Sequence, residues 1–95
     1  MRVTDEEIQT YLKGSMPVIW AWIWTELKPG KAKDELGEIL FDPTEHLRDL
    51  TVPWIRMAVT TASFDHPEIK ELVRGLVWES LPWWSRFLRC LNSKI

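Results

Sequence analysis

The chain has 95 residues, of which 45% are hydrophobic, and this length predicts a single small globular domain, residues 1–95, with one core. Its 12 Lys and Arg against 14 Asp and Glu leave a formal net charge of -2, so the basic surface typical of nucleic-acid binding is not expected. The longest uncharged apolar run, residues 16–25, is shorter than the ~20 residues of a membrane-spanning helix, which argues against a spanning role.

The first predicted helix begins at a capping box. Thr4 can accept a hydrogen bond from the backbone of Glu7 while the Glu7 side chain bonds back to Thr4. Ile8 and Leu12 then form an apolar stripe with helical spacing. Gly14 suits the left-handed residue that follows a helix end, so we expect the helix to stop there.

The stretch 16–27 is the one around which the other segments are expected to fold, because it holds three of the seven Trp residues. Read as a helix or as a strand, it is apolar on both sides, so it lies either in the middle of a core or between the core and an outside partner. Its length and its opening at Ser15 and Pro17 favour a helix. The alternative is an α+β fold in which residues 18–27 and 34–41 form a small hairpin.

Two further helix starts are predicted where an acidic residue precedes proline and glutamate. Asp42 would cap a helix whose apolar stripe runs over 47–61, with a kink or break at Pro53. Within it, residues 55–64 are rich in β-branched side chains and remain ambiguous. Asp65 would cap the most regular helix of the chain, whose apolar side chains recur from Ile69 to Val77.

The last predicted helix follows Ser80 and Pro82 and is strongly amphipathic. Its apolar side carries Trp83, Trp84, Phe87, Leu88, Cys90 and Leu91, and its opposite side carries Ser85, Arg86 and Arg89. In a small domain such an apolar side usually packs on the core, and we expect the same here; the alternative is a helix that lies in a partner's groove or in a membrane interface. Together the elements predict a mostly α fold, a compact bundle of five or six short helices.

The sequence offers little for chemistry. One acidic segment would place four potential metal ligands on a single helix face: Asp42, Glu45, His46 and Asp49. Helix starts are commonly acidic without binding metal, so we expect neither a metal nor a cofactor. His66 beside Asp65 can serve acid–base chemistry only with a nucleophile nearby, and no catalytic or phosphate-binding motif is found. We therefore expect a protein that is not an enzyme.

Cys90 is the only cysteine, so the chain cannot form an intrachain disulfide. A single thiol is typical of a reducing compartment, and we expect a cytoplasmic protein. Because its neighbours in sequence are apolar, we expect the thiol to be buried and unreactive.

Seven Trp side chains are many for a core of this size, since each buries roughly 150–250 Å² and its indole N–H needs an acceptor. We expect some of them to form a contact surface, either for another copy in a homo-oligomer or for a protein to which this chain is an accessory subunit. The predicted contact residues are Trp20, Trp22, Trp24, Trp83, Trp84, Phe87, Arg86 and Arg89. The alternatives are a Trp-walled pocket for an aromatic or cationic ligand and attachment of the last helix to a membrane surface.

Overall fold

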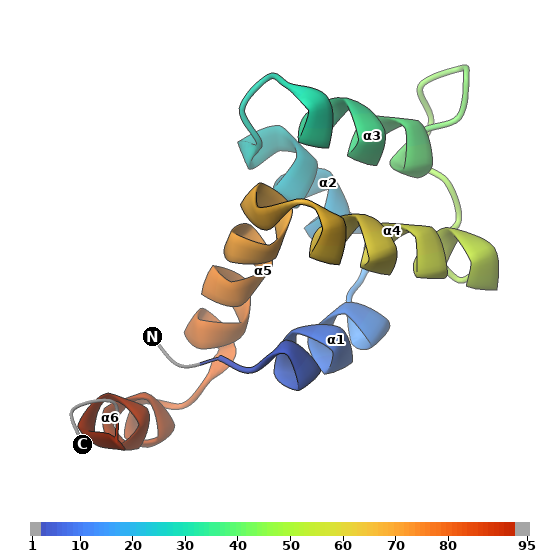
Figure 1. Cartoon of the computed structure of the whole chain (residues 1–95). Coiled ribbons are helices and arrows are strands. Elements are labelled where there is room, and N and C mark those ends of the chain that lie inside the picture. Colours follow the sequence, from blue (N-terminus) through green and yellow to red (C-terminus); the bar gives the residue numbers. More distant parts are fainter. Residues whose placement is uncertain (1–2, 93–95) are drawn as a thin grey trace.

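The computed structural model describes residues 3–92, and within this range the chain forms six helices and no strand (Figure 1). They are α1 (Asp5–Gly14), α2 (Pro17–Glu26), α3 (Lys31–Leu40), α4 (Pro53–Asp65), α5 (Pro67–Ser80) and α6 (Trp83–Asn92). The mostly α bundle predicted from the sequence is confirmed. The alternative hairpin is wrong, because residues 18–27 and 34–41 lie almost entirely in α2 and α3.

The predicted capping box starts α1. The Glu7 amide donates to Thr4 Oγ1 at 3.1 Å, and Glu7 Oε1 accepts from the Thr4 amide at 3.2 Å. These bonds satisfy backbone groups that a helix start leaves without intrahelical partners. The helix then buries Ile8 and Leu12 completely, as their spacing predicts. Its end differs from the prediction, because Gly14 is the last helical residue and extended Ser15 follows it.

A contact between two helices accounts for the glycine in the middle of α3. Trp24 on α2 donates its indole N–H to the Lys33 carbonyl at 3.1 Å and lies edge-on to the Phe41 ring, with centroids 5.2 Å apart. A Cβ on Gly37 would come within 2.9 Å of the Trp24 Nε1 atom. Gly37 therefore makes α3 less stable than alanine would, but it leaves room for the Trp24 indole.

The segment between α3 and α4 is a loop, so the helix predicted to start at Asp42 is wrong. Asp42 Oδ1 accepts from the Thr44 amide at 2.8 Å, from the Thr44 hydroxyl at 2.6 Å and from the His46 amide at 3.0 Å. Glu45 has a left-handed backbone with φ of 67°. These hydrogen bonds stabilise a turn. They occupy Asp42 Oδ1, the oxygen that would accept the capping hydrogen bond if a helix began here. Helix α4 begins only at Pro53, where a proline needs no amide hydrogen bond.

Helices α4 and α5 complete the bundle. The ambiguous segment 55–64 is helical throughout. Asp65 is the last residue of α4 and does not cap α5, which starts after His66 without a side-chain cap. Helix α4 packs against α3, α5 and α1, so it occupies the middle of the bundle. The fully buried side chains come from helices α1 to α5 and from the loop before α4: Ile8, Leu12, Trp20, Ile23, Leu36, Leu40, Leu50, Val59, Ser63, Ile69 and Val73.

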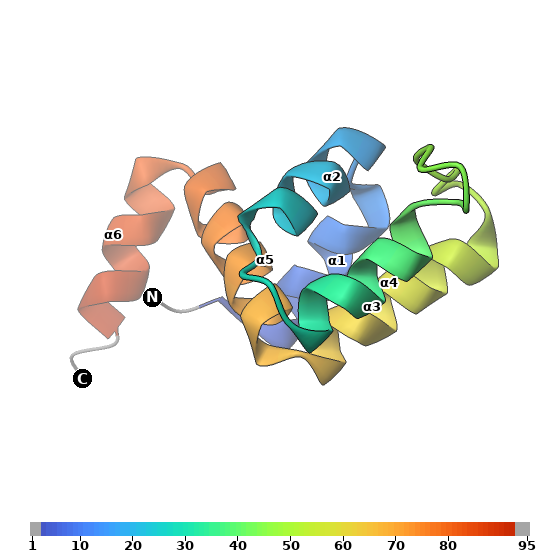
Figure 2. The same cartoon turned by 90° about the horizontal axis from the view of Figure 1, so that it is seen from above.

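Helix α6 stands apart from the other five at one end of the molecule (Figures 1 and 2). It packs extensively against none of the described helices. The molecule measures 49 × 26 × 18 Å, and its radius of gyration is 14.4 Å, against about 12 Å for a compact domain of this length. The projecting helix lengthens the molecule and leaves most of its own surface outside the bundle. Over residues 3–92, no helix has the length and apolar character needed to cross a bilayer.

Candidate interaction surface

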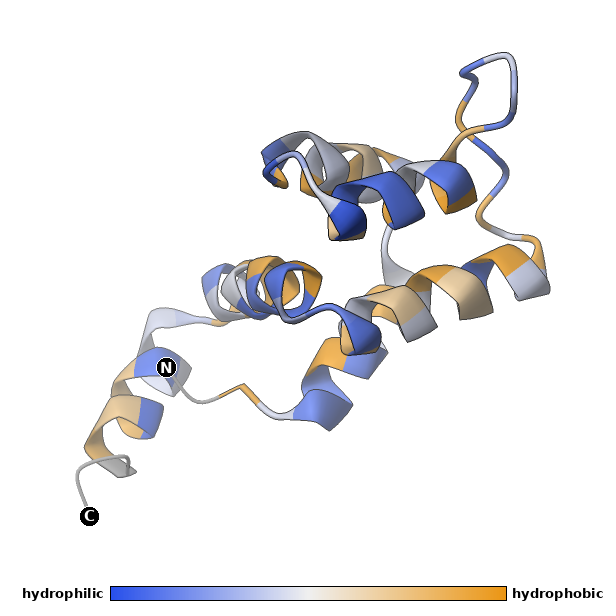
Figure 3. Ribbon diagram, turned by 45° about the horizontal axis from the view of Figure 1, so that its top comes forward, coloured by the Kyte–Doolittle hydropathy of each residue, from blue (hydrophilic) through white to orange (hydrophobic). Residues whose placement is uncertain are grey.

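Helix α6 turns its apolar side to the solvent. Five large side chains on this side are exposed: Trp83 by 74%, Trp84 by 56%, Phe87 by 58%, Leu88 by 51% and Leu91 by 45%. They follow one another around an arc of about 140° at 100° per residue, so they form one continuous strip, which we call the α6 face. Hydropathy colouring shows the apolar part of α6 on the side away from the bundle (Figure 3). The expectation that this side would pack on the core is wrong.

The polar side of the same helix faces the bundle. Ser85, Arg86 and Arg89 are each partly buried, whereas every residue of the α6 face is exposed. Arg86 even places its Nε atom out of contact with solvent, with no acceptor among the described residues. The helix therefore has the opposite orientation to that of an ordinary surface helix.

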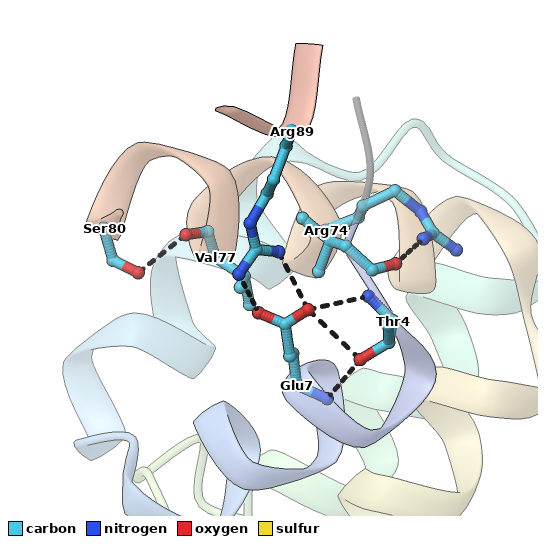
Figure 4. Close-up of polar contacts among 7 residues, drawn as sticks. Thr4, Glu7, Arg74, Val77, Ser80 and Arg89 are labelled. Atoms are coloured by element: carbon cyan, nitrogen blue, oxygen red, sulfur yellow. Dashed lines mark hydrogen bonds and ion pairs between the residues drawn. The ribbon is translucent and has the colours of Figure 1, made fainter. Parts of the chain in front are cut away.

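A bidentate ion pair between Arg89 and Glu7 accounts for this orientation (Figure 4). Arg89 Nη1 donates to Glu7 Oε1 at 2.8 Å, and Nη2 donates to Oε2 at 2.7 Å. The two parallel bonds hold the guanidinium and the carboxylate in one fixed geometry, which single ion pairs do not impose. Glu7 thus joins the start of α1 to the far end of the chain.

The electrostatics of Glu7 follow from its two sets of partners. Hydrogen bonds from Arg89, together with those from Thr4, hold the pKa of the Glu7 carboxyl at about 2, well below its usual 4.5. The same pair raises the pKa of the Arg89 guanidinium. Both groups are only partly exposed, with 31% and 26% of their side-chain surface in contact with solvent. The pair is therefore charged over the whole physiological pH range and holds α6 throughout it.

The molecule exposes more surface than a compact monomer of its mass, as expected if the α6 face is uncovered. The accessible surface is 6388 Å², whereas a compact monomer of 11.3 kDa exposes about 5,700 Å². At the exposures found here, the five side chains of the α6 face contribute roughly 600 Å². A patch of that size is at the upper end of what soluble monomers expose.

The three Trp residues of α2 do not form one surface. Trp20 is fully buried and belongs to the core, and Trp24 is half-buried against Phe41. Only Trp22 is exposed, by 44%. Because a helix turns by 100° per residue, Trp20 and Trp24 lie on the same inner side of α2, whereas Trp22 points to the opposite side. The predicted contact residues are thus divided between the core, the α3 contact and two separate surfaces.

A second, smaller set of exposed apolar side chains lies at the starts of α2 and α4. Met16 and Val18 are exposed near the start of α2, and Trp54 and Met57 near the start of α4. Arg56 ties these two regions together, since its Nη1 donates to the carbonyls of Leu12 and Ser15 at 2.8 and 3.0 Å. This set is spread over two helices, whereas the α6 face is one strip on one helix.

A hollow with a volume of about 850 Å³ lies beside Trp24 and Phe41. The Trp24 side chain of this hollow is already used within the chain. The Trp24 N–H is bonded to the Lys33 carbonyl, and the Lys33 ammonium lies 4.6 Å from the centre of the Trp24 ring. A cationic ligand would have to displace that ammonium, so the hollow favours a ligand less than its aromatic wall suggests.

The residues singled out for metal or acid–base chemistry are arranged differently from the prediction. Asp42, Glu45, His46 and Asp49 lie in the loop before α4 and share no helix face. Across residues 3–92, no group of three or more potential ligands is placed to hold a metal ion. His66 pairs with Glu35 on α3, not with its sequence neighbour Asp65, and this contact lowers the pKa of the Glu35 carboxyl. Cys90 is exposed, contrary to expectation.

No protein-family model, curated protein or solved structure matches the chain.

Glu7 is the residue of this region that the sequence did not reveal as an anchor. Its capping role was predicted, and that role already explains an acidic residue at this position. The one available signal was the absence of acidic residues after Glu79, which means that any carboxylate pairing with Arg89 must come from elsewhere in the chain. That signal cannot choose among the remaining acidic residues.

Proposed function

We propose that this protein is a non-enzymatic interaction module that docks onto a protein partner through the α6 face. The observation that supports this proposal is the orientation of α6, whose polar side is held against the bundle while five large apolar side chains face the solvent. Aromatic side chains are the commonest anchors of protein interfaces, and three of these five are aromatic.

The distribution of charge favours a protein partner over a membrane. Helices that lie in a membrane interface flank their apolar side with free Lys and Arg, which attract anionic headgroups. Here Arg89 is neutralised by Glu7, and Arg86 is partly buried on the side facing the bundle. The exposed residues of α6 are uncharged, and the whole chain carries a net charge of -2. A cytoplasmic setting, with a reduced Cys90, is part of the same proposal.

Site-specific photocrosslinking tests the proposal. A photoreactive benzoylphenylalanine would replace Phe87 in the middle of the α6 face and, in a control protein, exposed Thr61 on α4. Both proteins would be irradiated in an extract of the cells that make the chain. We expect a discrete protein adduct at position 87, no such adduct at position 61, and loss of the adduct when Trp84→Glu is added.

The outcomes separate the candidate functions. A protein adduct that depends on Trp84 supports docking through the α6 face. Adducts with lipid alone would replace the proposal by membrane attachment. Equal adducts at positions 87 and 61, or an adduct that survives Trp84→Glu, would show that the α6 face binds nothing specifically.

A further inference from the structure

From the area, charge and shape of the α6 face, we infer that its occupant is the α6 face of a second copy of the chain, packed antiparallel about a two-fold axis close to Phe87. This inference rests on the proposed function and adds the identity of the partner and the arrangement of the two helices. Four observations carry it.

The area matches what a small dimer needs. The side chains of the α6 face expose roughly 600 Å², and a specific interface typically buries about 800 Å² from each partner with a lower limit near 600 Å². Two α6 faces could therefore bury up to about 1,200 Å² in total, apart from any contribution of neighbouring residues. Interfaces at the low end of the size range are commonly those of weak complexes, so we expect the dimer to form in the micromolar range.

The α6 face is complementary to itself. Its exposed residues, together with Cys90, carry no charge. In a two-fold interface the same surface is used by both copies, so charges of a single sign on that surface would be buried without a partner of opposite sign. Two uncharged apolar strips can pack together without burying an unpaired charge. A charged partner surface would find no charge of opposite sign on the α6 face.

The order of side-chain sizes favours the antiparallel arrangement. The bulky Trp83 and Trp84 lie at the start of α6, and the smaller Leu88 and Leu91 lie towards its end. Antiparallel packing places Trp84 of one copy against the partner's Leu91, so that large side chains meet small ones. Parallel packing would crowd the Trp residues at one end and leave a gap at the other.

The position of α6 leaves room for a second copy. The helix lies at one end of the molecule, beyond α5, and its apolar side points away from the other helices (Figures 1 and 3). Two copies can thus approach end to end without a collision between their bundles. The ten residues of α6 span about 15 Å, enough for two layers of interlocking side chains on each helix.

Sedimentation analysis of the purified full chain tests the dimer. We expect the mass to rise from one copy to two as the concentration increases to about 100 µM. Phe87→Glu would place two carboxylates near the two-fold axis and should weaken the dimer at least about tenfold, whereas Thr61→Glu, on an exposed part of α4, should leave it unchanged. Circular dichroism verifies that each variant keeps its helices.

Cysteine pairs test the arrangement. In a Cys90→Ser background, Trp84→Cys and Leu91→Cys proteins would be oxidised separately and as a mixture. Antiparallel packing joins the mixed pair only, because two copies of position 84 would lie about 10 Å apart along the helices, beyond the reach of a disulfide. Parallel packing joins each protein to itself instead, and that result would overturn the antiparallel arrangement. Thr61→Cys serves as the control for random collisions.

Failure of this inference can be told apart from failure of the proposed function. A wild-type chain that stays monomeric at the highest concentration overturns the second copy as occupant, and specific crosslinks from position 87 to another protein would still support docking. A dimer that survives Phe87→Glu also overturns the second copy as occupant, because another surface would then be its interface. The proposed function fails separately, when position 87 gives no adduct that depends on Trp84.

Discussion

The anchoring role of Glu7 leads to the sharpest prediction, which concerns the Glu7→Gln variant. Glutamine at this position keeps a capping box with Thr4, because its side-chain oxygen still accepts from the Thr4 amide. It loses the negative charge and one of the two bonds with Arg89. The variant therefore weakens the attachment of α6 while it leaves the start of α1 intact.

The size of the effect follows from the pKa of Glu7. Its fall from 4.5 to about 2 corresponds to about 3.4 kcal/mol of preference for the charged form at 1.36 kcal/mol per unit. Part of this preference comes from the bonds with Thr4, and water screens a side chain that is 31% exposed. The share that holds α6 is then ~1–2 kcal/mol, which corresponds to a change of about 5- to 30-fold in the opening equilibrium.

Amide hydrogen exchange measures that opening directly. At neutral pH we expect the α6 amides of Glu7→Gln to exchange about 5- to 30-fold faster than those of the wild type, with α5 amides unchanged. Because the pKa of Glu7 is lower in the folded chain than in the unfolded one, its contribution is complete above pH 4.5 and is lost as the pH falls towards 2. Variant and wild type should therefore converge at low pH.

Two results would refute this reasoning. Equal α6 exchange in variant and wild type at neutral pH would mean that the ion pair does not hold the helix. Equal acceleration in α1, α5 and α6 would mean that Glu7 acts on the whole fold and not on the attachment of α6. Thr4→Ala is the matched control, since it removes the cap acceptor at a cost of about 1 kcal/mol but keeps the Glu7 carboxylate.

Thermal unfolding followed by circular dichroism tests two further pairs of substitutions. Gly75→Ala should raise the Tm by about 4–8 °C, because its Cβ meets nothing within 4 Å and alanine favours the helix by about 1 kcal/mol. Gly37→Ala should lower the Tm despite the same gain, because its Cβ displaces the bonded Trp24 indole, and equal shifts for the two glycines would contradict this. Trp20→Ala should cost about 3–5 kcal/mol, while Trp54→Ala, at a side chain that is 61% exposed, should cost less than about 1 kcal/mol; similar losses would contradict the assigned positions in core and surface.

The helices that the sequence predicts well are those whose signals are local. The capping box at Thr4 and the stripe of Ile8 and Leu12 lie within nine residues, and both features of α1 appear in the structure. The helical form of α2 was also predicted from its length and from Pro17. Such signals depend on neighbours a few residues apart, which a sequence displays directly.

The failure at Asp42 has a physical cause. An Asx turn and a helix N-cap use the same interaction, an Asp side-chain oxygen that accepts from an amide a few residues later. The choice between them depends on whether the next residues can bury a helical stripe. Here Leu47 is 38% exposed whereas Leu50 is fully buried, so no continuous buried stripe begins until α4. The metal hypothesis depended on the same helix and fails with it.

The orientation of α6 lies beyond local signals altogether. Amphipathic spacing shows that the helix has an apolar and a polar side, but it does not show which one meets the bundle. The contact that decides the matter joins Arg89 to Glu7, 82 positions away along the chain. Either orientation was compatible with the sequence, and the commoner one was expected.

An outward apolar side makes α6 dependent on its surroundings. A ten-residue helix is too short to be stable alone in water, and α6 gains little from packing on the bundle. Its attachment through Glu7 therefore holds it by only ~1–2 kcal/mol, while its α6 face remains in water. Covering that face would stabilise the helix and the docked orientation together, because a partner binds only the arrangement in which the five side chains form one strip. The ion pair and the apolar strip thus act together: Glu7 and Arg89 hold α6 in the orientation that exposes the strip, and a partner that covers the strip stabilises that orientation further.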